Sequence, residues 1–154
     1  MARKSNNLAL NIIAQNQNSV VLNNRLSKAV TFAAGTTGAV GSFKILTVTG
    51  TVALTCFAVC GTTLTSGGAA TIEVGTTATT AGLIAQTTAT NIAAKEIYHD
   101  ATPDASIELT SVITHKIVTE DVYYKVATTT ITGGVLTFII GWTPISPDGN
   151  VELA

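Results

Sequence analysis

Apolar and polar residues alternate through the middle of the chain with the period of a β-strand. Between residues 51 and 60, one set of alternate positions is entirely apolar: Val52, Leu54, Cys56, Ala58 and Cys60. Because successive side chains of a strand point to opposite faces, we expect this set to face the core. The other set mixes threonine with Phe57 and Val59. Such a face is typical of a surface that meets another protein layer.

Two later segments show the same alternation. Residues 121–126 alternate between an apolar and a polar set, which predicts a half-buried strand. Residues 135–143 place four apolar residues on one face: Leu136, Phe138, Ile140 and Trp142. The sequence Thr-Gly-Gly at 132–134 is predicted to turn the first of these strands into the second. A Thr-Ser-Gly-Gly sequence at 65–68 predicts a tight hairpin into residues 70–74.

The remaining strands are predicted to be short. They cover residues 43–49, 83–91 and 96–99, with one or two more within 106–118. The ending PISPDGNVELA has two prolines and a DG turn, so we expect it to leave the sheet as a loop or tail. Short strands joined by glycine turns predict an all-β domain over residues 43–154. An antiparallel β-sandwich of the jelly-roll type is favoured, with a closed barrel as the alternative.

The first 28 residues differ from the rest of the chain. They contain seven asparagines and two glutamines, with scattered leucine, isoleucine and valine and no glycine or proline. These apolar residues are too few to form a core and too many for a simple disordered tail. We therefore expect residues 1–28 to form an extended N-terminal arm that needs a partner surface. Residues 29–42 are predicted to connect the arm to the domain, with a possible first strand.

Composition indicates a surface built for protein contacts. Charged residues make up 11% of the chain, and about a sixth of it is threonine, which fits a sheet and keeps a face polar without a charge. The net charge is −1, but residues 1–72 carry five basic and no acidic residues, whereas residues 73–154 carry three basic and nine acidic ones. Such asymmetry could steer one molecule onto another. The basic residues are too sparse for a nucleic-acid groove, so we expect no nucleic-acid partner.

Cysteine and hydropathy patterns suggest a protein made in a reducing cytoplasm. Cys56 and Cys60 are four residues apart on one strand, about 13 Å along it, which is too far for a disulfide between them. We expect two small buried thiols. The N-terminal segment is interrupted by asparagine and glutamine before a secretory apolar region could form. The longest apolar run, residues 135–142, is too short to cross a membrane.

Few residues suggest a catalytic or metal-binding role. His99 with Asp100, and His115 with Glu120 and Asp121, are the clusters that could hold a transition metal, but they lack the spacing of established zinc motifs. The loop carboxylates Glu96, Asp100, Asp104 and Glu108 could form a weak calcium site. Solvated carboxylates are the simpler interpretation. No GxSxG sequence frames a serine nucleophile. We therefore expect no catalytic, cofactor-binding or metal-binding residue.

Three aromatic residues could form a carbohydrate-stacking platform: Tyr123, Tyr124 and Trp142. However, Tyr124 and Trp142 lie on the apolar side of alternating strands. Core packing is therefore the favoured interpretation.

Three segments resemble small virion proteins encoded beside the structural genes of tailed bacteriophages. They are CGTTLTSGGAATIEVGTTATTAGLIAQTTAT from Cys60 onward, EIYHDATPDASIE, and GWTPISPDGNVELA, and the resemblance covers residues 43–154. It implies a non-enzymatic virion protein, made in the host cytoplasm. Capsid decoration proteins, which cement neighbouring major capsid subunits and are commonly oligomeric, are the closest functional match. A neck, tail or fibre component, a receptor-binding module, and a bacterial adhesin or carbohydrate-binding domain are the alternatives.

Overall fold

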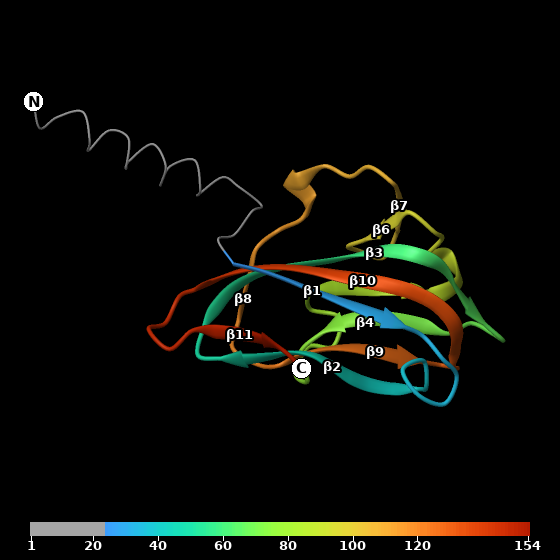
Figure 1. The fold of residues 1–154 in the computed structure, drawn as a ribbon, viewed down its shortest axis with the longest axis horizontal. Coiled ribbons are helices and arrows are strands. Elements are labelled where there is room, and N and C mark those ends of the chain that lie inside the picture. Colours follow the sequence, from blue (N-terminus) through green and yellow to red (C-terminus); the bar gives the residue numbers. More distant parts are fainter. Residues whose placement is uncertain (1–23) are drawn as a thin grey trace, which may run out of the picture.

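The computed structural model describes residues 24–154, which fold into two antiparallel β-sheets packed face to face (Figure 1). The strands are β1 (Asn24–Thr31), β2 (Gly41–Thr49), β3 (Val52–Ser66), β4 (Thr71–Gly75), β5 (Ile84–Thr88), β6 (Glu96–Tyr98), β7 (Asp104–Ala105), β8 (Lys116–Val118), β9 (Val122–Ala127), β10 (Ile131–Pro144) and β11 (Asn150–Leu153). Two short 3-10 helices, η1 (Ala89–Asn91) and η2 (Thr110–Val112), interrupt the connections. The predicted all-β sandwich is confirmed.

The first sheet has the order β1-β10-β3-β6-β7, with β8 also paired to β3, and the second has the order β11-β2-β9-β4-β5. The first sheet is built on β3 and β10, the two longest strands, which pair antiparallel along most of their length. Burial alternates as predicted on β10 from Leu136 to Ile140 and on β3 from Cys56 to Cys60. The predicted inward residues of β3, from Val52 to Cys60, are all buried, but Ala53 and Thr55 on the opposite face are buried as well. Trp142 is half-buried and packs against the core.

Aromatic side chains join the two sheets at the centre of the sandwich. Tyr124 of β9 is 2% exposed and stacks on Phe138 of β10 across the interior, with ring centroids 6.0 Å apart. Its other neighbours are Phe43, stacked at 5.0 Å, and Phe32, which meets it edge-on at 5.6 Å. The hydroxyl group of Tyr124 donates a hydrogen bond to the Thr37 carbonyl. The predicted core roles of the residues on these two strands are therefore confirmed.

The two predicted hairpins are wrong. β3 lies in the first sheet and β4 in the second, so residues 67–70 cross between sheets instead of reversing within one. The same is true of the connection from β9 to β10. Gly133 and Gly134 lie inside β10, at a shift in its register with β3. Gly134 has φ +109°, and a Cβ there would lie 2.6 Å from the Leu64 side chain. Glycine is therefore required at this position by a bulge within β10, not by a turn between strands.

The C-terminal prediction is also wrong. Residues 150–153 do not leave the sheet, because β11 pairs with β2 from Asn150 opposite Thr49 to Leu153 opposite Leu46. Val151 is buried there, whereas its neighbours in the strand are exposed. A strand of four residues gives only a weak alternation in the sequence, and the two prolines before it favoured a loop. Residues 106–118 contain only β8 and η2, with irregular backbone between them.

The sheet begins earlier than predicted. β1 pairs with β10 from Asn24 opposite Trp142 to Thr31 opposite Val135, so residues 24–28, assigned to the arm, form the first part of a strand. Leu26 and Val30 point inward on this strand. An edge strand makes few apolar contacts, so most residues of β1 are polar. The apolar alternation is therefore too weak to predict a strand from the sequence. The rest of the predicted arm, residues 1–23, lies outside the described residues.

We predict that the buried side chains on the inward faces of β3 and β10 stabilise the fold. Leu54 and Phe138 are fully buried, so replacing either with alanine should lower the free energy of unfolding by about 2–5 kcal/mol. Thr137→Ala, on the opposite face of β10, is the matched control and should change it by less than about 0.5 kcal/mol. Urea unfolding followed by circular dichroism measures the three values. Equal effects would contradict the face assignment.

Candidate functional site

The outward face of the first sheet carries no charged side chain on three adjacent strands, over residues 27–31 of β1, 135–139 of β10 and 57–59 of β3. Strand register aligns its residues in rows, with Ser27, Ile139 and Phe57 in one and Ala29, Thr137 and Val59 in the next. Phe57 and Ile139 are half-buried, and Val59 is 36% exposed. We call this surface the outer face. It is the surface that the alternation between residues 51 and 60 predicted.

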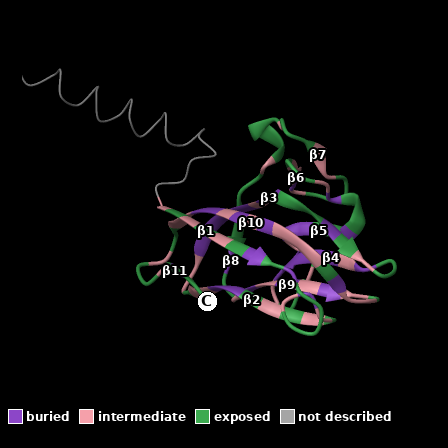
Figure 2. Cartoon of the chain, turned by 45° about the vertical axis from the view of Figure 1, so that its right-hand side comes forward, coloured by how far each residue is buried: buried purple, intermediate pink, exposed green. Residues whose placement is uncertain are grey.

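The segment between β7 and β8, residues 106–115, projects above the first sheet (Figure 1). It is exposed over most of its length (Figure 2) and carries large apolar side chains. Ile107 is 82% exposed, Leu109 68% and Val112 44%, and Ile117 in the following strand is 64% exposed. Within residues 24–154 nothing covers these side chains, so this segment is a second apolar surface available for contact.

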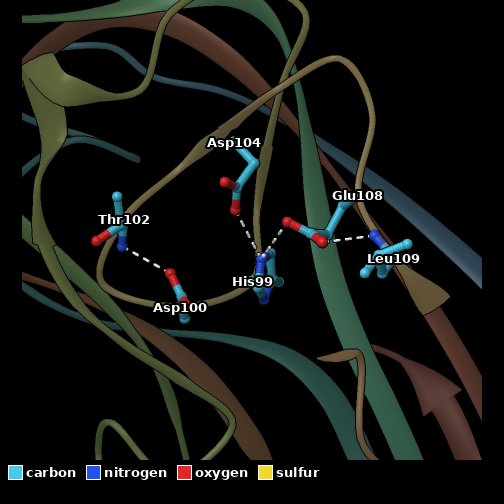
Figure 3. Close-up of polar contacts among 6 residues, drawn as sticks. All are labelled: His99, Asp100, Thr102, Asp104, Glu108 and Leu109. Carbon is cyan, nitrogen blue, oxygen red and sulfur yellow. Dashed lines mark hydrogen bonds and ion pairs between the residues drawn. The ribbon is translucent and has the colours of Figure 1, made fainter. Parts of the chain in front are cut away.

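A histidine and two carboxylates meet where this segment leaves the first sheet (Figure 3). The side chain of His99 is 8% exposed, and its Nε2 atom lies 2.9 Å from Asp104 Oδ2 and 3.3 Å from Glu108 Oε2. Asp100 lies near them. One potential ligand atom from each of His99, Asp100 and Asp104 lies within 4.8 Å of the other two. Asp100 accepts a hydrogen bond from the Thr102 amide. The structure thus brings together three of the four loop carboxylates named from the sequence.

The other predicted ligands are not part of this cluster. Glu96 accepts a hydrogen bond from the Ala93 amide at 2.7 Å. His115 is exposed, and Glu120 accepts a hydrogen bond from the Thr77 hydroxyl group. Asp121 instead faces β2. Among the described residues, the second histidine cluster suggested by the sequence does not form a potential metal-ligand group.

Asp121 belongs to a structural ion pair. Its carboxylate lies 2.8 Å from Lys44 Nζ and accepts a hydrogen bond from the Val48 amide. These two hydrogen bonds, that from Lys44 first, lower the pKa of Asp121, and the same contact with Asp121 raises the pKa of Lys44. The pair joins β2 to the start of β9, so its role is in the fold.

The three aromatic candidates do not form a platform. Tyr124 is buried in the core and Trp142 is half-buried against it. Tyr123 points to the opposite side of β9 from Tyr124, where it lines a small pocket with Ser42 and Lys125. A carbohydrate-stacking surface would need these rings side by side and exposed.

Two larger cavities are lined by residues of both sheets and of the connections between them. One, of about 340 Å³, is lined by residues between Gly75 and Leu83 and by β8 with the two residues that follow it, Thr119 and Glu120. The other, of about 230 Å³, is lined by His99 and Asp100, by Cys56, and by residues 112–114 of the projecting segment. The second cavity therefore opens beside the histidine–carboxylate cluster.

Both cysteines are free and buried, as predicted. Burial raises the pKa of the Cys56 thiol to about 12, and burial is also the main reason that the pKa of Cys60 is raised. Cys60 Sγ also donates a hydrogen bond to the Thr62 carbonyl. A thiol with a raised pKa is a poor nucleophile at neutral pH, because the thiolate is the reactive form.

Comparisons with known proteins identified no relative of this chain. No family model, no curated protein and no solved structure matches the chain. The resemblance to phage virion proteins therefore depends on the three sequence segments alone. Within residues 24–154, no helix has the length and apolar character needed to span a bilayer.

We predict that the Cys56 thiol makes stability depend on pH in the alkaline range. Below pH 9 the thiol is protonated in both states, whereas between pH 9 and about 12 only the unfolded chain loses the proton. The free energy of unfolding should therefore fall as pH rises, by at most about 1.4 kcal/mol per pH unit from this group.

Urea unfolding of the wild-type chain and of Cys56→Ala between pH 8 and 10.5 measures the effect. Tyr124, whose pKa burial raises to about 12, contributes equally in both proteins, so the difference in slope isolates Cys56. Parallel slopes would contradict the prediction.

Proposed function

We propose that this chain is a non-enzymatic structural protein of a tailed-phage virion, which binds neighbouring subunits through the outer face of its first sheet. The position most consistent with its segments is that of a capsid decoration protein. The observation that carries the proposal is the uncharged outer face, where Phe57, Val59 and Ile139 lie among threonine, serine and alanine across three paired strands.

Such a face is suited to being covered by protein. A partner that buries charged side chains must remove their water, which costs several kcal/mol per ion unless each is paired. Burial of apolar area instead contributes about 25 cal/mol per Å². Threonine hydroxyl groups can hydrogen-bond across the contact at little desolvation cost. A rigid sheet also loses little conformational freedom when it is covered, which favours affinity.

The projecting segment extends this contact. Its backbone rises on the side of the first sheet away from the second (Figure 1), and its residues Ile107, Leu109 and Val112 are exposed. Together the two surfaces offer apolar side chains from the first sheet and from the segment beside it. A neighbouring subunit that fits both would be held in one orientation, as a cementing role requires.

Fewer basic residues are available to attract an acidic partner than the sequence suggested. Lys28 donates hydrogen bonds to the backbone oxygens of Lys44 and Ala154, and Lys44 pairs with Asp121. Two of the five early basic residues thus serve the fold itself. Arg25 is exposed at the border of the outer face and remains suited to attracting an acidic partner.

The direct test is the position of the chain in purified virions made from the genome that encodes it. We expect mass spectrometry to find it in many copies per particle. Cryo-electron microscopy should place its density between major capsid subunits, at threefold or quasi-threefold positions of the shell. Density in a ring at one vertex would assign it to the neck or tail instead. Absence from the particle would overturn the proposal.

The outer face itself is tested with charged substitutions. We expect Val59→Lys and Thr137→Lys each to abolish cosedimentation with particles that lack the native protein, because lysine brings a charge that the partner must desolvate. The melting temperature should stay within a few degrees of the wild-type value, since neither side chain is in the core. Thr49→Lys, at an exposed position of the second sheet, is the matched control. Unchanged binding by the outer-face variants would contradict this surface.

A further inference from the structure

The cluster around His99 has an unusual hydrogen-bonding arrangement. One ring nitrogen, Nε2, faces both Asp104 and Glu108 (Figure 3). A nitrogen in an imidazole ring carries at most one proton, so it can direct that proton at only one of the two carboxylates. The side chains of His99 and Glu108 are 8% and 15% exposed, so little water is available to satisfy the second oxygen.

The spacing of these atoms matches that of ligands around a small metal ion. Imidazole nitrogen and carboxylate oxygen bind Zn²⁺ at about 2.0–2.2 Å, which places neighbouring ligands of a tetrahedral ion about 3.3 Å apart. In the structure, Nε2 lies 2.9 Å from Asp104 Oδ2 and 3.3 Å from Glu108 Oε2. The ligand atoms of His99, Asp100 and Asp104 all lie within 4.8 Å of one another, so modest side-chain movements would bring them to the separations of a bound ion.

We propose that His99, Asp100 and Asp104, whose ligand atoms all lie within 4.8 Å of one another, bind a divalent transition-metal ion of the zinc type, with Glu108 Oε2, 3.3 Å from the same ring nitrogen, as the candidate fourth ligand. The nitrogen ligand favours zinc over calcium, because calcium prefers a shell made only of oxygen. The cavity of about 230 Å³ lined by His99 and Asp100 supplies the route by which an ion and its water reach the site.

This site departs from the expectation of no metal that the sequence supports. It does not depend on the proposed virion role. Its structural consequence is local: the ion would tie Asp104 and Glu108 to the end of β6, and so hold the base of the projecting segment that carries Ile107 and Leu109.

The test uses the full chain, stripped of metal with EDTA and kept reduced with a phosphine. Isothermal titration with ZnCl₂ should show one ion per chain, and the melting temperature should rise by several degrees in zinc. His99→Gln should weaken zinc affinity by more than roughly tenfold, the loss that even an outer-sphere change can cause. His115→Gln removes the other, exposed histidine and should bind zinc as the wild type does. Both variants keep both cysteines, so zinc bound by thiols would not differ between them.

Asp104→Asn and Glu108→Gln give a second measure in case His99→Gln fails to fold. Each should weaken zinc binding while the metal-free protein keeps a cooperative unfolding transition. The proposal is overturned if the wild-type chain shows no saturable zinc binding, if His115→Gln and His99→Gln lose affinity equally, or if calcium alone raises the melting temperature.

Discussion

The structure depends on the contact between the apolar faces of its two sheets, and that contact is centred on Tyr124. Its ring lies between Phe138 of the first sheet and Phe43 of its own, and its hydroxyl group is satisfied by the Thr37 carbonyl. Large aromatic rings bury much apolar area for little entropy, so three of them at one point secure the separation and alignment of the sheets. A second link lies toward β6, where the buried hydroxyl group of Tyr98 reaches the backbone carbonyls of Ile72 and Ala85 in the second sheet.

This contact leaves the opposite faces of β3 and β10 pointing away from the core. The inward residues of β3 and β10 form the core, whereas Phe57, Val59, Thr137 and Ile139 on the opposite face are half-buried or exposed. Threonine suits the outward positions because it favours an extended backbone and adds no charge. Since β1 closes one edge with Lys28 bound across to β2 and the C-terminus, the outer face is presented on a rigid body.

Both of the surfaces assigned a role lie on the first sheet or project from it. The outer face is formed by the long strands, and the segment between β7 and β8 rises beside it. The base of that segment is held by Asp104 and Glu108 against His99. The exposed apolar residues of the segment and the polar cluster are therefore linked through one short stretch of chain.

The sequence by itself determined which side chains of the regular strands face the core, because a period of two is a local property that Leu54, Tyr124 and Phe138 display without reference to the rest of the fold. It did not determine which strands pair. Glycines at 67–68 and 133–134 mark changes of direction or bulges, but only packing decides whether the next strand joins the same sheet or the facing one. The edge strands β1 and β11 have one neighbour each, so their patterns are weak and their pairing depends on β10 and β2. The histidine cluster shows the same limit: His99 and Glu108 are nine residues apart, and only the path of the chain through β7 brings their side chains together.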